Sequence, residues 1–167
     1  ISFNYECDFS LENEDVYDLT IEDNHNFFAN GLLVHNCVEI GMIPYFLEKE
    51  TKISGWQGCN LTEGNGSKCT TKARFLEICK GLAILGTIQA SYTDFKYVKD
   101  VTKKIFDKEA LLGCSLTGWM MNPHILFDEE IMKEGARLIK EINKEVAEMI
   151  GINQAARLTC VKPSGNA

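Results

Sequence analysis

The sequence predicts a mixed fold, with a small all-β segment over residues 1–36 followed by an α/β segment over residues 37–167. Three observations lead to this prediction. Residues 1–36 contain many turn formers and short strand-length runs, with almost no helical periodicity. Helical patterns then cover residues 71–92 and 128–150. Strand-length runs separate and follow these helical patterns, and such alternation is typical of α/β proteins.

The first segment carries one strand signal and one hairpin signal. Residues 16–21 alternate between apolar and polar side chains, as a half-buried strand does. Two apolar runs, 27–28 and 32–34, flank Ala29 and the pair Asn30-Gly31. Asn-Gly is the strongest short hairpin signal. We therefore expect a small β element before residue 37.

The second segment carries two helix signals of different kinds. Residues 71–92 are apolar on nearly every side, which predicts a helix buried within a large protein. Residues 128–150 predict an amphipathic helix, which Asp128 can cap and after which Gly151 suits the left-handed position. Its apolar stripe comprises Ile131, Leu138, Ile142 and Met149. The expected strands are 111–117 and 157–162.

Composition and charge narrow the class of protein. The 167 residues are 45% hydrophobic and 25% charged, which is typical of a globular chain. The net charge of −7 does not favour direct nucleic-acid binding. No apolar run approaches the roughly 18–20 residues that span a membrane, so no membrane partner is expected. The chain starts at Ile1 and stops without a terminal signal, so we expect a fragment of a longer protein.

The seven cysteines predict reduced thiols and no metal site. Their number is odd, their spacing is wide and no CxxC pair occurs, which argues against a disulfide framework or structural zinc. A cytoplasmic protein is therefore expected. Cys69 is predicted to be an exposed spectator, whereas Cys79, Cys114 and Cys160 are predicted to be core residues. His124, beside Pro123, is expected in a loop and not as a metal ligand.

The run from residue 16 to Cys37 ends in His35-Asn36-Cys37 and holds a second imidazole at His25. It closely resembles the C-terminal splicing blocks of inteins. The resemblance implies that the Asn36 side-chain amide attacks its own backbone carbonyl, forming a succinimide and breaking the bond to Cys37. Cys37 would first receive the upstream flank as a thioester. His25 and His35 would supply protons, because imidazole titrates near neutral pH.

Residues 1–36 are accordingly expected to be the C-terminal splicing segment of an intein. The N-terminal intein half and its flanking host sequence are missing from this chain. Alone, the chain is therefore expected to perform at most cleavage after Asn36, unless a separate N-terminal half complements it.

Four ordered blocks after the junction, 58–63, 84–95, 115–118 and 161–165, resemble the catalytic subunit of ribonucleotide reductases. The best match is the adenosylcobalamin-dependent branch, and it covers essentially all of residues 37–167. The resemblance implies α/β units that form part of a ten-stranded barrel. It also implies an oxidoreductase that makes deoxyribonucleotides from ribonucleotides by thiyl-radical chemistry.

The resemblance assigns roles to three residues near the junction. Cys37 matches the cysteine that becomes a thiyl radical and abstracts the ribose 3′ hydrogen. Glu39 matches the general base on the 3′ hydroxyl; in extended backbone, residues two apart point to the same side. Cys59 matches one of two cysteines that reduce the 2′ carbon and end as a disulfide, and its partner would lie upstream of this chain.

The resemblance also implies the ligands. Pro163, Ser164 and Gly165 match the loop that binds the substrate phosphate through backbone N–H groups. The family often has Thr after this glycine, where this chain has Asn166. The implied partners are a ribonucleoside di- or triphosphate and a thioredoxin-type reductant, and the implied cofactor is adenosylcobalamin.

Three alternatives remain open at this point. The reductase could belong to the oxygen-dependent class, which has a related barrel and a separate radical-generating subunit. The chain could also be primarily a splicing or homing element with an incidental host flank, although no homing-endonuclease motif is present. Finally, it could be a cysteine-containing α/β domain without chemistry.

Overall fold

The computed structural model describes residues 26–29, 32–35 and 44–162. Contacts between residues divide the chain into two compact units, Ile1–Cys37 and Val38–Ala167. The expected domain boundary between Asn36 and Cys37 lies outside the described residues and stays a prediction.

The described residues of the first unit form an antiparallel hairpin. Strand β1 (Asn26–Ala29) pairs with β2 (Leu32–His35), with Asn26 opposite His35 and Ala29 opposite Leu32. The two-residue connection confirms the hairpin that the Asn-Gly pair predicts. The predicted strand at 16–21 lies outside the described residues.

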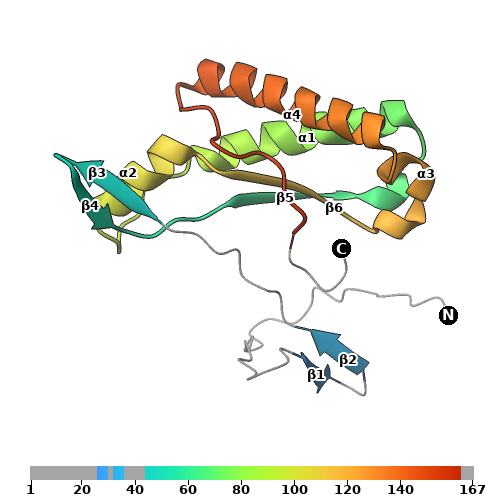
Figure 1. Cartoon of the computed structure of the whole chain (residues 1–167), viewed down its shortest axis with the longest axis horizontal. Coiled ribbons are helices and arrows are strands. Elements are labelled where there is room, and N and C mark those ends of the chain that lie inside the picture. Colours follow the sequence, from blue (N-terminus) through green and yellow to red (C-terminus); the bar gives the residue numbers. More distant parts are fainter. Residues whose placement is uncertain (1–25, 30–31, 36–43, 163–167) are drawn as a thin grey trace, which may run out of the picture. The chain divides into compact units, whose positions relative to one another are not determined.

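The second unit is built on a parallel sheet (Figure 1). Strand β5 (Asn60–Asn65) runs parallel to β6 (Leu112–Thr117) in continuous register. On the other side of β6, Thr159 forms a parallel bridge with Cys114. The segment 157–162 therefore continues the sheet in the order β5, β6, 157–162, although only one bridge forms where a strand is predicted.

Two long helices, α1 (Lys72–Ala90) and α4 (Glu129–Ile150), pack against each other over one face of this sheet (Figure 1). Both match the predicted helices. The Asp128 side chain accepts a hydrogen bond from the Ile131 N–H (2.9 Å), and Gly151 has a φ of 76°. The predicted cap and the predicted left-handed end of α4 are therefore confirmed.

The predicted apolar stripe of α4 needs a correction. Its buried line comprises Gly135, Ile139, Asn143 and Ala147. Met149 is 81% exposed, while the other three predicted stripe residues are only partly buried. The reason is the close approach of α1: a Cβ on Gly135 would lie 2.6 Å from the Phe75 ring. The buried line therefore includes the small residues Gly135 and Ala147, and the larger apolar residues of the predicted stripe flank it.

Helix α1 buries only part of its surface within the chain. Its buried residues form one side, which includes Phe75, Cys79 and Leu82, whereas Leu85 is 62% exposed and Ile88 is 40% exposed. The Thr71 hydroxyl accepts from the Arg74 N–H (3.2 Å) and caps the first turn.

A second hairpin and a shorter helix have no counterpart in the sequence prediction. Strand β3 (Tyr45–Glu48) pairs with β4 (Thr51–Ser54) through a turn in which Lys49 and Glu50 both have positive φ. Such turns usually contain Asn or Gly, so this hairpin carries no turn signal. Helix α2 (Asp100–Glu109) lies beside β3 (Figure 1).

Short helical turns surround the ends of the sheet strands. Turn η1 (Gly66–Lys68) follows β5, and η2 (Trp119–Met121) follows β6. Helix α3 (Pro123–Leu126) comes next and contains His124. The expected loop position of His124 is therefore wrong, because Pro123 starts a helical turn here.

The described strands form three two-stranded sheets, β1–β2, β3–β4 and β5–β6, and these do not close into a barrel. The expected fragment of a ten-stranded barrel stays a prediction. In the described part of the chain, no helix has the length and apolar character that a membrane span requires.

Candidate functional site

The face of the parallel sheet opposite α1 and α4 carries most of the candidate chemistry. A Cβ on Gly86 of α1 would lie 3.4 Å from Leu112 and 3.6 Å from Thr62, so these two side chains face the helices. Side chains alternate along a strand, so Gly113 and Glu63 face the other way. We call this opposite side the second face; its residues are Cys59, Leu61, Glu63, Gly113, Ser115, Cys160 and Lys162.

Two cysteine sulfurs meet over Gly113 on the second face. The Sγ of Cys59 and the Sγ of Cys160 each lie 2.9 Å from the point that a Cβ on Gly113 would occupy. Cys59 directly precedes β5, and the Cys160 N–H donates to the Cys114 carbonyl (3.2 Å). Both thiols are free and partly exposed. The missing side chain of Gly113 thus makes room for the Leu61 side chain and for two thiols from segments 101 positions apart in the chain.

Both thiols are held in their protonated form. Burial, with smaller contributions from the neighbouring Cys160 and Cys114 thiols, raises the pKa of the Cys59 thiol from 9.0 to about 11. Burial also raises the pKa of Cys160. Thiols are nucleophiles only as thiolates, so neither group is a strong nucleophile at neutral pH.

An ion pair and a hydrogen bond fix the end of the segment 157–162. Lys162 Nζ lies 2.8 Å from Glu63 Oε2, with side chains 31% and 25% exposed. The Lys162 N–H donates to the Ser115 hydroxyl (2.9 Å), and Ser115 is buried. A partly exposed ion pair contributes at most about 1 kcal/mol, so we assign it a positioning role. It holds the chain directly before Pro163.

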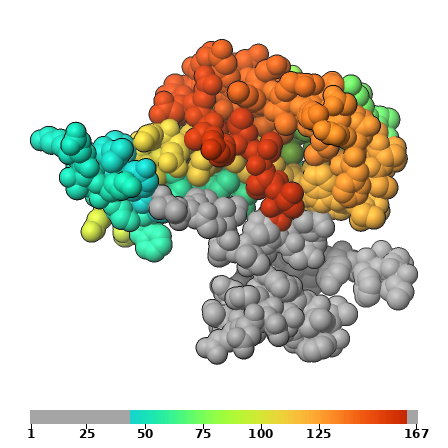
Figure 2. All heavy atoms as spheres, viewed as in Figure 1, coloured from blue at the N-terminus to red at the C-terminus, as the bar shows by residue number. Residues whose placement is uncertain are grey.

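The segment 157–162 lies at the surface of the second unit. The space-filling view in Figure 2 shows the last described residues, coloured red, on the outside of the molecule. Val161 is 66% exposed, whereas the Cys114 N–H donates to the Leu158 carbonyl (2.9 Å) beneath it. The segment 157–162 therefore completes the second face. Along most of its length, only backbone hydrogen bonds join it to β6.

The other described cysteines are buried on the helix side. Cys79 and Cys114 are 3% and 4% exposed, which confirms their predicted core positions. The expectation that Cys160 lies in the core is wrong, because it is partly exposed on the second face. Cys69 was expected to be exposed but is fully buried. Turn η1 folds it inward, and its N–H donates to the Gly66 carbonyl (3.0 Å).

Most of the residues that sequence analysis assigns to the site lie outside the described residues. His35 is the last residue of β2, directly before Asn36. Cys59 is the one predicted site residue whose side chain is described. Those outside the described residues are His25, Asn36, Cys37, Glu39, Pro163, Ser164 and Gly165.

A cavity of about 280 Å³ lies between α1, α4 and β6. Its lining is largely apolar, with Phe75 and Ile139 on the helices and Cys114 on β6. Trp119 also lines it, and its Nε1 is buried without a hydrogen-bond partner among the described residues. Across the described ranges, no group of three or more His, Cys, Asp or Glu side chains could hold a metal ion.

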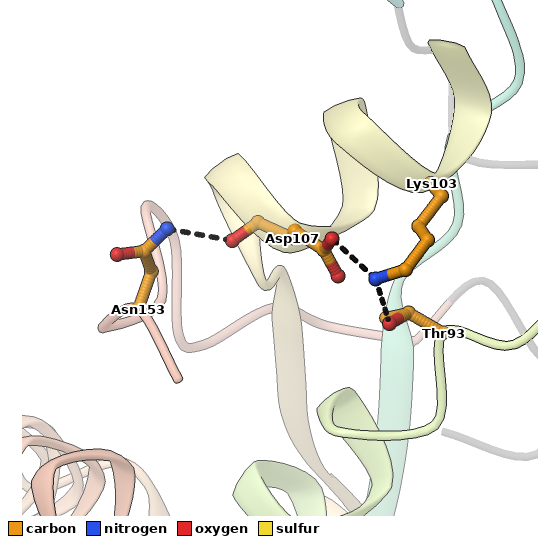
Figure 3. A network of polar contacts seen from close by, with 4 residues as sticks. All are labelled: Thr93, Lys103, Asp107 and Asn153. Atoms are coloured by element: carbon orange, nitrogen blue, oxygen red, sulfur yellow. Dashed lines mark hydrogen bonds and ion pairs between the residues drawn. The ribbon is translucent and has the colours of Figure 1, made fainter. Parts of the chain in front are cut away.

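A network of polar contacts connects α2 to two loops, one that follows α1 and one that follows α4 (Figure 3). Lys103 Nζ lies 2.5 Å from Asp107 Oδ2 and donates to the Thr93 hydroxyl (3.1 Å). Asn153 Nδ2 donates to the Asp107 carbonyl (2.8 Å). The network orients the loop that follows α1. This loop belongs to the block 84–95, and we assign a structural role to the network.

Of the polar residues on the second face, sequence reasoning assigned a role only to Cys59. Glu63, Ser115 and Lys162 had a usable signal, because they lie in the blocks 58–63, 115–118 and 161–165. Gly113 and Cys160 had none beyond their places in predicted strands. In comparisons with known proteins, no family model, no curated protein and no solved structure matches this chain.

Proposed function

We propose that the chain joins the C-terminal splicing segment of an intein, residues 1–36, to part of a ribonucleotide reductase catalytic subunit, residues 37–167. The observation that carries the proposal is the ordered run His25, His35, Asn36, Cys37. It contains the cyclising amide, two proton donors and the acceptor thiol in the order that splicing chemistry requires.

Two structural features support the splicing half of this proposal. The hairpin β1–β2 ends at His35, so the cyclising residue follows a regular strand directly. The chain also divides into compact units next to the proposed junction, between Cys37 and Val38. A scissile bond between two separately packed units can break without unfolding either of them.

The splicing half is tested by the intact mass of the purified chain after incubation at neutral pH. We expect a species comprising residues 37–167 and a 1–36 piece that ends in a succinimide. The matched control is Asn36→Ala, which removes the amide and must abolish both products. If the wild-type chain stays intact even with an N-terminal intein half added in trans, the splicing proposal fails.

The reductase half is supported by the sequence blocks and by the state of Cys59. A protonated thiol that is partly exposed on a sheet face is the form that can donate reducing hydrogen to a bound substrate. We propose Cys37 as the radical thiol, Glu39 as the base on the 3′ hydroxyl and Pro163–Gly165 as the phosphate loop. Adenosylcobalamin would generate the radical when bound, and no described residue is assigned as its contact.

The reductase half is tested after reassembly of the full subunit by splicing in trans. We expect adenosylcobalamin-dependent formation of deoxyribonucleotide from a ribonucleoside di- or triphosphate with a thioredoxin-type reductant. Cys59→Ser should stop multiple turnover, because the 2′ carbon loses one of its two reductants. Activity that needs a separate radical-generating subunit and no cobalamin would instead support the oxygen-dependent class.

A further inference from the structure

We propose that Cys59 and Cys160 form a redox-active dithiol on the second face, which a disulfide of another molecule oxidises by exchange to an intramolecular disulfide. The inference rests on the positions of the two sulfurs and does not depend on the splicing or reductase assignments.

The first argument is proximity. Both sulfurs lie 2.9 Å from one point above Gly113, so they are at most about 5.8 Å apart. The Leu61 side chain also reaches this point, with its Cδ2 at 2.4 Å. A disulfide requires them to close to about 2.05 Å. Cys59 lies outside β5, and the Cys160 N–H donates to the Cys114 carbonyl of β6. The two cysteines lie on opposite sides of β6, so bond formation requires the backbone of the segment 157–162 to shift toward Gly113. This shift involves none of the hydrogen bonds of the β5–β6 ladder.

The second argument is selective access. Of the five cysteines in the described part of the chain, Cys69, Cys79 and Cys114 are at most 4% exposed. Cys59 and Cys160 alone are partly exposed. An external disulfide can therefore reach this pair while the other three thiols stay shielded. The accessible thiols are also the adjacent ones, which is the arrangement that exchange requires.

The exchange proceeds in two balanced steps. The thiolate of one cysteine attacks an external disulfide, which forms a mixed disulfide and releases one external thiolate. The thiolate of the second cysteine then attacks the protein sulfur of the mixed disulfide. This forms the Cys59–Cys160 bond and releases the second external thiolate. The two protein protons pass to the two released thiolates, so the external disulfide gains the two electrons that the pair loses.

The pair has a consequence for the proposed reductase. Cys59 is expected there to bond with a cysteine upstream of this chain. The Cys160 thiolate would attack Cys59 in that disulfide and release the upstream cysteine as a thiolate. The resulting Cys59–Cys160 disulfide would then accept two electrons from an external dithiol, which is itself oxidised to a disulfide. This consequence rests on the proposed function, whereas the pair itself does not.

The test uses the 167-residue chain in oxidised glutathione, with residual thiols blocked and peptides mapped by mass spectrometry. We expect a linked Cys59–Cys160 peptide in the wild type. At about 0.1 mM reduced glutathione, a millimolar effective concentration of the second thiol should favour this link over glutathionylated Cys59 by about tenfold. In Cys160→Ser, glutathione should instead remain on Cys59. The control variant, Cys114→Ser, changes a buried thiol of the same region and should keep the link.

A second measurement avoids oxidation and any effect of a variant on folding. The reduced wild-type chain is treated with dibromobimane, which becomes strongly fluorescent once both arms have alkylated thiols. We expect one fluorescent cross-link, between Cys59 and Cys160. The proposal is overturned if Cys59 stays glutathionylated in the wild type and no bimane cross-link forms, or if Cys59 links to Cys7 or Cys37 instead.

Discussion

The buried amide of Asn143 should contribute more to stability than any exposed asparagine of the chain. Asn143 lies on α4, is 3% exposed, and its Nδ2 donates to the Thr87 hydroxyl of α1 (2.9 Å). That hydroxyl donates in turn to the Ala83 carbonyl (2.7 Å). The Asn143 Oδ1 accepts from the Ala155 N–H (3.0 Å), in the loop after α4. One side chain thus connects both long helices and the segment that leads to the second face.

The expected cost of Asn143→Ala follows from these contacts. The variant removes two hydrogen bonds and leaves the partly buried Ala155 N–H without its partner. An unsatisfied buried group costs about 1–3 kcal/mol, and a partly buried one lies toward the lower end of this range. Loss of buried side-chain contacts adds to this cost, whereas the higher helix propensity of alanine returns about 0.5 kcal/mol. We therefore expect the free energy of unfolding to fall by about 2–3 kcal/mol.

Urea unfolding of the full chain measures this effect. Trp56 and Trp119 both belong to the second unit, so their fluorescence reports its unfolding. The matched control is Asn153→Ala, which removes the same group from an exposed position with a single hydrogen bond. We expect that control to cost under about 1 kcal/mol. Equal losses in the two variants would refute the reasoning that burial of the network makes Asn143 important.

Four further predictions concern close packing and thiol ionisation. Gly135→Ala should destabilise the second unit by about 1–3 kcal/mol in urea unfolding, because its methyl would meet the Phe75 ring. Gly81→Ala, with nothing within 4 Å, should instead stabilise by about 0.5–1 kcal/mol. The rate of Cys59 alkylation by iodoacetamide should rise about tenfold per pH unit until pH approaches 11, because only the thiolate reacts; a plateau near pH 9 would contradict this. Burial raises the pKa of Cys79 from 9.0 to about 12, so the folded state holds that proton more tightly. The resulting stability is complete below pH 9 and should fall by about 1.4 kcal/mol per pH unit from there toward pH 12, relative to Cys79→Ala.

Local signals were sufficient to predict the long helices and the first hairpin. The limits of α4 follow from Asp128 and Gly151, because a cap and a left-handed end are properties of a few neighbouring residues. The hairpin β3–β4 was missed for the opposite reason. Its turn residues, Lys49 and Glu50, adopt positive φ although their side chains disfavour it, so tertiary context and not turn chemistry selects this conformation.

Packing between distant segments was beyond the reach of sequence patterns. The predicted stripe of α4 selected the larger apolar residues, whereas the buried line contains Gly135 and Asn143. A glycine and an asparagine at these positions make sense only once Phe75 and Thr87 of α1 are placed against them. Cys69 shows the same limit, because its polar sequence neighbours suggested exposure and the fold of η1 decided its burial.

The pairing of Cys59 with Cys160 illustrates why a site can be missed when each of its residues is known. Cys59 was predicted to act with a partner outside the chain, and Cys160 was predicted to be inert core. Their proximity depends on two facts that no local pattern contains: the segment 157–162 lies on the far side of β6 from β5, and Gly113 of β6 lacks a side chain at the point between them. Any larger residue at 113 would separate the two sulfurs. The glycine is therefore as much a part of the proposed dithiol as the cysteines are, and its role becomes visible only when the order of the three parallel segments is known.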